Sequence, residues 1–444
     1  MTRKTLFTAG VLASALGLGA GSARAAEPTT EQLMQQIQQL QSKVEQLEAK
    51  QSPALSAQQV DKTVERVIQD ADRRSQLLQM EGFTAGWTKD KGFRIQDAQG
   101  NWALQPLLEF QFRSDSNWRN DGKHGGSDQD TENGFDVRRM ALGFTGNAFT
   151  PNLTYFFMWN SGDSSLGLEQ AWVKYFFNDD WALRAGQIRN PVFHEQAIGP
   201  THQLAADRSL VNLLITGADE AFTQAITLQY DSKDSPIWAE IGLEDGFQSG
   251  GTNFLDPNEG GNTDWGVFGR VNYFIKGDHK AYGDFTAMGN RDDLMVIGGG
   301  GDITQVGDVT FYLHTVDFQW ENSGGLGIYA AFLGDYIDNQ GTDDTFYNWG
   351  VLVQAGYMIN DRWEVFGRYD YTHFDSDLVS SGESEEYCEL TAGVNWYVGG
   401  GHNAKVTLDL TYLPNGSPTD DTDLGILTGG DTQLLARAQF QLLL

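Results

Sequence analysis

The sequence predicts an all-β protein, a 16-stranded antiparallel transmembrane β-barrel preceded by a periplasmic coiled-coil helix. Three observations favour this fold class. The chain begins with a secretory signal, yet no later stretch is apolar enough for a membrane-spanning helix. From residue 92 onward, segments of about 8 to 14 residues alternate in polarity, as strands do. Short turns between these segments alternate with long, acidic, glycine-rich loops, as they do in outer-membrane barrels.

Residues 1–25 have the features of a signal peptide. Arg3 and Lys4 precede an apolar run at residues 6–20, and a small-x-small pattern at 23–25 provides a cleavage site. A transmembrane helix would need about 18 to 20 apolar residues, and this run is shorter. We therefore expect an exported protein that resides in the outer membrane of a diderm bacterium, with its N-terminal segment in the periplasm.

The charge and the cysteine content exclude other classes. The net charge is −30 and becomes −33 when Arg3, Lys4 and Arg24 leave with the signal peptide. Such a chain repels nucleic acid, whose binding needs basic patches. The single cysteine, Cys388, excludes a disulfide within the chain.

Residues 26–81 are predicted to form a periplasmic coiled-coil segment. Apolar residues recur at intervals of 4, 3, 4 and 3, Pro53 interrupts the pattern, and a similar spacing then resumes. The alternative, a helix packed on the body of the protein, would need a wider apolar stripe. The apolar positions are Leu33, Ile37, Leu40, Val44 and Leu47, then Val60, Val64, Val67 and Ala71.

Residues 92–444 are predicted to form the barrel. In "EVFGRYDY", for example, Val365, Tyr369 and Tyr371 share one face while Glu364, Arg368 and Asp370 share the other. A soluble sandwich would also alternate, but aromatic residues near the strand ends favour the girdles of a membrane barrel. The last strand reaches the chain end, so we expect it to pair with the first and close the barrel. The expected strands are 102–113, 134–147, 152–160, 168–177, 181–190, 220–231, 236–244, 264–275, 280–289, 308–320, 326–337, 346–359, 362–374, 386–398, 402–413 and 431–444.

Four stretches of the chain resemble the phosphate-selective porin O and P family. They are "GFRIQDAQGNWALQPLLEFQF", "GFDVRRMALGFTGNAF", "LEQAWVKYFFNDDWALRAGQIRNPVF" and "DRSLVNLL", within residues 92–214. The resemblance implies a homotrimeric, 16-stranded outer-membrane channel whose basic lumen residues favour anions, including phosphate. An N-terminal coiled coil occurs in some related porins and would suit a trimer. Two features depart from the family: the chain ends in Leu444 rather than an aromatic residue, and its charge is acidic.

Strand parity predicts which charged side chains line the pore. Of the pair Arg138-Arg139, parity turns Arg139 inward and Arg138 towards lipid. The expected inward bases and acids nearly balance, so they either form a positive track or pair with one another. The expected inward bases are Arg113, Arg139, Lys174, Arg184, Arg270, Arg368, Lys405 and Arg437, and the expected inward acids are Glu109, Glu240, Asp284, Glu364, Asp370, Glu389 and Asp409.

The connection at residues 190–219 is long, partly apolar and sparsely charged. By analogy with porins, we expect it to fold into the channel as a constriction loop. Its two histidines are eight residues apart with no carboxylate at ligand spacing, so no metal site is predicted. The candidate residues of this loop are His194, Glu195, His202, Asp207 and Arg208.

The sequence predicts no enzyme and no cofactor, because GxSxG, HExxH and Walker motifs are absent from the mature chain. The first functional hypothesis is a trimeric outer-membrane porin that is embedded in lipid and lets small hydrophilic solutes and ions, including phosphate, diffuse passively. The second is a structural anchor that ties the outer membrane to the cell wall through residues 27–80.

Overall fold

The computed structural model divides the chain into two compact units, Met1–Leu77 and Leu78–Leu444. The predicted signal peptide and nearly all of the predicted coiled coil lie outside the described residues. Among the described residues, no helix is long and apolar enough to cross a membrane. The structure describes Ser42 and residues 82–88, 92–119, 131–161, 167–218, 220–248, 263–288, 293–379, 384–419, 424–427 and 432–444.

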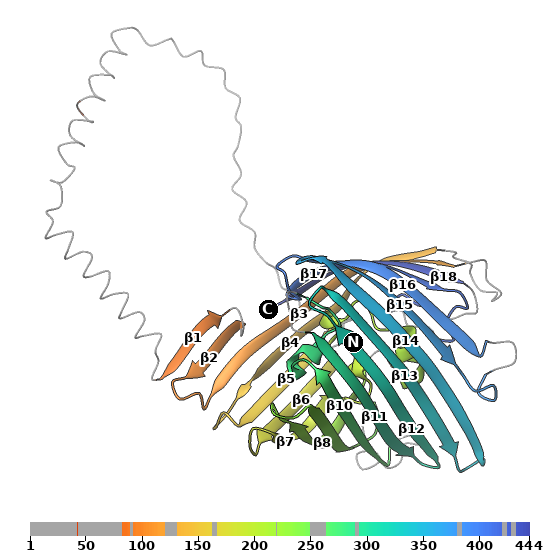
Figure 1. Ribbon diagram of the computed structural model, residues 1–444, viewed down its shortest axis with the longest axis horizontal. Helices are drawn as coiled ribbons and strands as arrows, with labels where there is room; N and C mark the ends of the chain where they lie inside the picture. The colour runs from red at the N-terminus through yellow and green to blue at the C-terminus, as the bar shows by residue number, and fades with distance from the viewer. Residues whose placement is uncertain are drawn as a thin grey trace, which may run out of the picture. The chain divides into compact units, whose positions relative to one another are not determined.

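In the described part of the second unit, sixteen strands, β3 to β18, form a closed antiparallel barrel (Figure 1). Each strand pairs with the next one along the chain, and β18 pairs with β3 from Gln433 opposite Arg119 to Leu443 opposite Glu109. The last strand therefore has no free edge at which another chain could pair. The predicted 16-stranded barrel and its closure are confirmed.

The barrel is continuous from β3 to β18, and its first strand follows a separate hairpin, β1–β2. Short helical turns occur only in connections among the described elements. The strands are β1 (Phe83–Thr88), β2 (Gly92–Asp97), β3 (Ala103–Arg119), β4 (Thr131–Asn147), β5 (Leu153–Asn160), β6 (Gly167–Phe176), β7 (Trp181–Arg189), β8 (Phe222–Asp231), β9 (Ile237–Glu244), β10 (Trp265–Lys276), β11 (Leu294–Val306), β12 (Val309–Glu321), β13 (Leu326–Asn339), β14 (Asp344–Asn360), β15 (Trp363–His373), β16 (Glu386–Tyr397), β17 (Ala404–Leu413) and β18 (Gln433–Leu443). The helical turns are α3 (His194–Ala197), η2 (Pro200–His202), α4 (Leu210–Thr216) and η3 (His279–Gly283).

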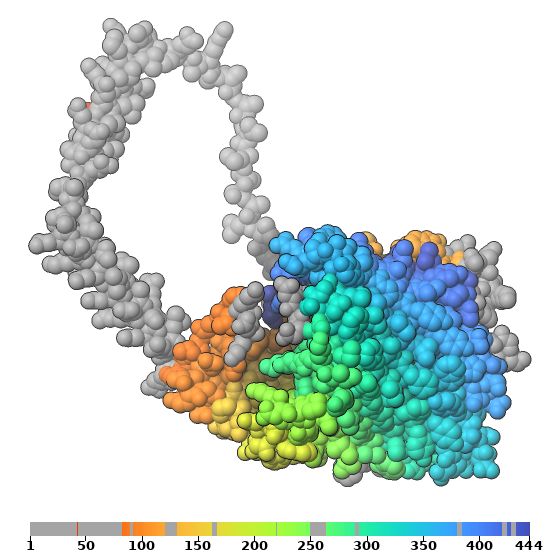
Figure 2. All heavy atoms as spheres, viewed as in Figure 1, coloured from red at the N-terminus to blue at the C-terminus, as the bar shows by residue number. Residues whose placement is uncertain are grey.

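The two faces of the barrel wall follow the alternation of the sequence. Along β15, Trp363, Val365 and Tyr369 are exposed, while Glu364 and Asp370 are fully buried. Apolar and aromatic side chains thus point outward, and polar side chains point into the lumen, as a membrane barrel requires. Figure 2 shows the outer face of the wall from β10 to β16, in green to blue, as a continuous surface.

The ninth barrel strand differs from the prediction. Residues 280–289 were expected to form it, but they contain η3 and an irregular segment, and β11 at residues 294–306 takes the place of the strand. A short connection at 276–279, between the expected strands 264–275 and 280–289, is wrong for the same reason, because the connection runs from 277 to 293. Asp284 is buried, as expected of an inward acid, but it lies in this connection rather than on a strand.

Four successive glycines hid β11, because a glycine run normally indicates a turn. Inside this strand, the missing side chains of the glycines leave space for groups that pack against its inner face. A Cβ added at Gly298 would overlap the Arg270 guanidinium, and one at Gly300 would come within 3.0 Å of the Val192 carbonyl oxygen. The run therefore lets a side chain and a loop backbone approach the barrel wall closely.

Candidate functional site

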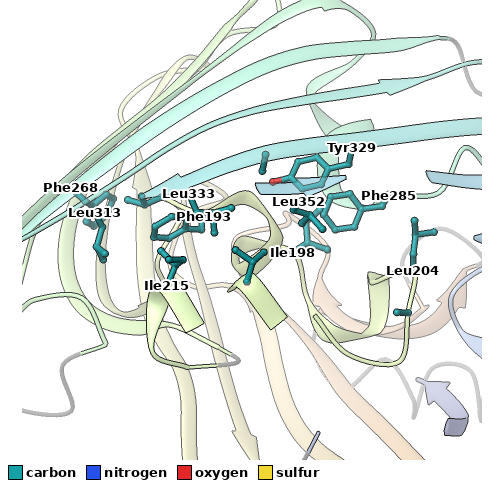
Figure 3. Packing of buried hydrophobic residues seen from close by; sticks show 14 of the residues in the cluster. Phe193, Ile198, Leu204, Ile215, Phe268, Phe285, Leu313, Tyr329, Leu333 and Leu352 are labelled. Atoms are coloured by element: carbon teal, nitrogen blue, oxygen red, sulfur yellow. The ribbon is translucent and has the colours of Figure 1, made fainter. Parts of the chain in front are cut away.

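The connection between β7 and β8 occupies the barrel lumen, and we call it the lumen loop (residues 190–221, with Asp219 outside the described part). It contains α3, η2 and α4, and most of its described side chains are buried. Figure 3 shows loop residues such as Phe193, Ile198 and Ile215 beside apolar side chains of the wall. The loop is therefore seated by a hydrophobic core inside the barrel. The wall residues of this core include Phe268, Leu313, Tyr329, Ala331, Leu333, Leu352 and Phe366.

Helix α4 of the lumen loop docks its first turn on carboxylates of the wall. The backbone N–H of Leu210 donates to Glu389 at 2.8 Å, and that of Val211 donates to Asp370 at 3.2 Å. The N-cap Ser209 accepts a hydrogen bond from the N–H of Asn212. Carboxylates are favourable at a helix N-terminus because its N–H groups lack partners within the helix. These predicted inward acids therefore hold the loop.

Asp207 of the lumen loop lies among three arginines of the wall. One of its carboxylate oxygens is 2.7 Å from Nη1 of Arg113 and 3.0 Å from Nη1 of Arg437, and the other is 3.7 Å from Nε of Arg138. Burial favours the neutral acid, but the positive charges of Arg113 and Arg437 outweigh it and lower the pKa of Asp207 to about 2. The loop is thus fixed by an ionised carboxylate where β3, β4 and β18 meet. Arg437 also binds the predicted inward acid Asp409 at 2.8 Å.

Arg138 was expected to face lipid, and that prediction is wrong. The register between β3 and β4 shifts between Gln111 and Arg113, so the simple alternation is interrupted opposite this point. A β-bulge re-aims side chains in this way. Arg138 therefore reaches Asp207, while its neighbour Arg139 is also buried on the inward side.

A second cluster of arginines surrounds Glu220, which the sequence analysis did not select. Its Oε1 lies 2.9 Å from Arg139, 3.0 Å from Arg189 and 3.2 Å from Arg208. Burial opposes ionisation, but these guanidinium groups hold the pKa of Glu220 well below its usual value. Parity alone would miss Arg189, because it is the last residue of β7, where the chain turns inward. Arg139 also pairs with Glu169.

The remaining predicted bases also have partners. Arg270 binds Asp317 at 2.8 Å, Arg368 binds Glu389 at 2.6 Å, and Arg184 binds Glu240 at 2.5 Å. Lys405 donates to the Gln203 carbonyl of the lumen loop at 2.8 Å, and Lys174 lies over the Phe176 ring at 4.8 Å. The inward bases are therefore largely engaged with acids and with the loop, which favours the paired arrangement over a free positive track.

The other predicted inward acids are also placed by this network. Glu364 is buried and accepts hydrogen bonds from Tyr397 at 2.6 Å and from Asn395 at 2.9 Å. Asp409 accepts from the backbone N–H of Ala206 at 2.8 Å as well as from Arg437. Glu109 points inward on β3 and lines an open cavity of the lumen, described below.

The connection between β10 and β11 enters the barrel from the end that carries the short turns, and supports the lumen loop there. The Tyr282 ring stacks on the His194 ring at 3.7 Å, and Phe285 lies edge-on to His194. Tyr282 also donates to Asp317 at 2.6 Å. Burial lowers the pKa of His194 to about 3, so the ring is neutral there. Sequence reasoning missed this segment because it assigned these residues to a strand.

The other candidate residues of the lumen loop are buried in contacts of their own. Glu195 accepts from Oγ of Ser209 at 2.5 Å, and burial raises its pKa although Arg368 opposes the shift. Arg208 donates to the carbonyl of Ile198 at 2.7 Å. The His202 ring lies 4.5 Å from that of His402. Within the described ranges, no three His, Cys, Asp or Glu side chains are placed to hold a metal ion.

An open cavity of about 550 Å³ lies between the lumen loop and the wall from β5 to β10. A much smaller space, of about 10 Å³, lies between the loop and Arg138 and Arg139 of β4. That volume is about what one water molecule needs. The lumen of the described barrel is thus divided unequally by the loop. The lining of the larger cavity includes Glu109, Arg184, Arg189, Trp238, Lys280 and Tyr282.

Comparison with known proteins agrees with this architecture. The sequence profile of the phosphate-selective porin O and P family matches residues 109–287, a stretch that includes the lumen loop. A search of curated proteins finds no match. The family expected from the sequence is therefore supported by a match over part of the barrel.

Solved porin structures share the fold. An anion-selective porin from Comamonas acidovorans is 12% identical, with a TM-score of 0.53 over 77% of this chain and 100% of that one. Salmonella typhi OmpF, in complex with daunomycin, is 14% identical, with a TM-score of 0.51 over 77% of this chain and 98% of that one. In-vitro folded OmpT of Vibrio cholerae, in a trimer form, is 11% identical, with a TM-score of 0.50 over 76% and 99%.

The fold is similar to that of solved outer-membrane porins. Fold and family match together support an outer-membrane channel for the diffusion of solutes, and they point to a channel rather than an enzyme.

Proposed function

We propose that the protein is a non-catalytic porin through which small hydrophilic solutes and ions diffuse passively, along the cavity between the lumen loop and strands β5 to β10. The observation that carries this proposal is the cavity itself, which is open and is lined by both acidic and basic side chains. Purified protein inserted into planar bilayers should produce stable ohmic conductance steps. A protein that inserts, as shown by its protection from protease, but never conducts would refute the proposal.

The ion selectivity should be weak. The inward bases are engaged by Asp207, Glu220 and other acids, so few positive charges remain to attract anions. The long loop segments at 375–386 and 414–431 carry nine acids and no Lys or Arg, which raises the local concentration of cations at one mouth of the pore. The zero-current potential across a tenfold KCl gradient tests this expectation. A strong anion preference with block by added phosphate would instead show that phosphate selectivity carries over from the family.

The assembly is proposed to be a homotrimer embedded in outer-membrane lipid. A trimer form of a porin with a similar fold supports this proposal. The heptad spacing at 26–81 does not, because β-branched Ile37 and Val44 alternating with Leu by rule favour a two-stranded coiled coil. Residues 1–25 would be removed on export, and 26–81 would lie in the periplasm, where residues 27–80 could contact the cell wall. The mass of the native complex in detergent should equal three mature chains that begin at Ala26. A mass equal to one or two chains would reject the trimer.

A further inference from the structure

Strands β1 (Phe83–Thr88) and β2 (Gly92–Asp97) pair as a two-stranded hairpin that lies outside the closed barrel. Its strands pair from Phe83 opposite Asp97 to Thr88 opposite Gly92. Among the described residues, its strand pairing with β3 consists of two residue pairs, Ile95 with Leu104 and Gln96 with Ala103. In Figure 1 the hairpin, in orange, extends the sheet beyond the start of β3. An isolated two-stranded hairpin is marginal in water, so this one needs further contacts.

The two faces of the hairpin differ sharply in polarity. Phe83, Ala85 and Trp87 of β1 lie on the same face as Phe93 and Ile95 of β2, as the residue pairs show. Asp97, opposite Phe83, shares this face but is buried at its end, where it accepts a hydrogen bond from the Trp102 N–H at 2.9 Å. The other face carries Thr84, Gly86 and Thr88 opposite Gln96, Arg94 and Gly92. The apolar face is open: Trp87 is 69% exposed and Phe93 is 46% exposed.

The apolar face of the hairpin continues the lipid-facing surface of the barrel. Paired residues of adjacent strands point to the same side of a sheet, so Ile95 shares the side of Leu104. Leu104 lies on the outward face of β3, the face that also carries the exposed side chains of Phe112 and Trp118. The polar face continues the inward side, where Arg94 donates to Asn147 at 3.1 Å.

The hairpin also lies at the membrane boundary. It precedes Ala103, which pairs with Asn147 at the end of the barrel that carries the short β4–β5 turn. Short turns face the periplasm in outer-membrane barrels. At this end Trp102 packs on Phe149, with ring centroids 4.4 Å apart, as expected of an aromatic belt at the interface.

We propose that the hairpin β1–β2 is a membrane-surface element that inserts the side chains of Phe83, Trp87, Phe93 and Ile95 into the headgroup region of the periplasmic leaflet. Tryptophan and phenylalanine on one face, with polar residues on the other, suit a segment that lies in the plane of the interface. Strand β1 pairs with β2, and N–H and C=O groups along its other edge can be satisfied by water at that depth but not in the hydrocarbon core. The alternative is that a second copy of the chain covers the apolar face. The continuity of this face with the lipid-facing wall of the barrel favours lipid.

The test uses the full chain with Cys388 replaced by alanine, so that an environment-sensitive fluorophore can be attached at Trp87→Cys. Thr88→Cys, one position along on the polar face, is the matched control, and Phe112→Cys on the outward barrel wall is the lipid-exposed reference. Each variant is reconstituted in phosphatidylethanolamine and phosphatidylglycerol vesicles, and its heat-modifiable gel mobility verifies a folded barrel. Quenching by spin-labelled lipids and by aqueous iodide is then measured.

The expected result is that the Trp87→Cys label is quenched by spin-labelled lipid and shielded from iodide, at a depth of about 5–10 Å into the headgroup and acyl boundary, while the Thr88→Cys label is quenched by iodide. Equal iodide quenching of the two labels, without lipid quenching, would overturn the proposal by placing the face in water. A Trp87→Cys label that is shielded from both quenchers and cross-links to a second copy would overturn it in favour of an interface between protomers.

Discussion

The lumen has two unlike halves, and the lumen loop packs mainly against one of them. The wall from β11 to β18 offers the loop apolar side chains such as Leu313 and Leu352, and carboxylates such as Asp370 and Glu389. The wall from β5 to β9 instead borders the open cavity with Arg184, Glu240 and other polar groups. We call the wall from β11 to β18 the scaffold half, because it supports the loop, and the wall from β5 to β9 the cavity half, because it borders the proposed permeation path. Charges in the scaffold half should govern stability, and charges in the cavity half should govern permeation.

Asp207 joins the two halves at the seam of β3, β4 and β18, so its removal should have the largest effect. Asp207→Asn leaves Arg113, Arg138 and Arg437 with one anion fewer in a buried site. Removing one partner of a buried ion pair costs about 3–5 kcal/mol. We expect a large fall in the thermal midpoint of the barrel and a shift of the zero-current potential towards anions.

The control for Asp207 is Asp115→Asn. Asp115 forms an ion pair with Arg113 at 2.8 Å, and its side chain is more exposed than that of Asp207. Asp115→Asn should lower the free energy of unfolding by less than half as much as Asp207→Asn does, and it should change the ion selectivity little. If the two variants behave alike, the seam does not depend on the loop carboxylate, and the division of the lumen into two halves loses its main support.

Phe285 tests whether the β10–β11 connection supports the lumen loop from the periplasmic end. Its ring is 2% exposed and lies 4.7 Å from Tyr329 and 5.5 Å from His194. Phe285→Ala should cost about 3 kcal/mol by creating a cavity, and should increase current noise as the loop loosens. Phe149→Ala is the control because Phe149 is 72% exposed at a turn, so stability and noise should remain as in the wild type. A quiet channel in Phe285→Ala would mean that the connection does not steady the loop.

His194 gives the scaffold a pH dependence. Its Nε2 lies 2.9 Å from Gln319 Oε1, and burial lowers its pKa to about 3, against an unfolded value near 6.5. The unfolded chain therefore binds a proton below about pH 6.5 that the folded chain does not, so stability falls as the pH falls. The loss is about 1.4 kcal/mol per pH unit, or about 2 kcal/mol between pH 6.5 and 5.

Thermal unfolding at pH 7, 6 and 5 measures this loss. We expect His194→Gln to remove it, while His314→Gln, on the outward face and away from the loop, should retain it. An unchanged pH slope in His194→Gln would show that another group, not the buried imidazole, makes the scaffold sensitive to acid.

The sequence predicted the barrel well because alternation and turn lengths are local properties of each strand. It placed both Arg368 and Asp370 inward, since β15 alternates without interruption. It failed where the local rule is broken by tertiary contacts. The bulge beside Arg138 and the inward curl of Arg189 change side-chain direction without a sequence signal. Partners such as Asp207 and the wall arginines lie far apart in the chain, so no spacing rule could join them.

The four glycines of β11, which the sequence analysis did not assign to a strand, give the prediction with the smallest expected effect on stability. Gly298 faces inward, where an added Cβ would overlap Arg270 and lie 2.6 Å from Asp317 Oδ1. Gly299 faces outward, and its nearest neighbour would be the Thr315 carbonyl at 3.5 Å. Gly298→Ala should therefore cost about 1–2 kcal/mol by displacing the ion pair, while Gly299→Ala should be neutral or slightly stabilising. Thermal midpoints of the two variants decide the matter. Equal midpoints would mean that the Arg270–Asp317 pair does not require glycine at position 298. The glycines of β11 would then need an explanation other than this ion pair.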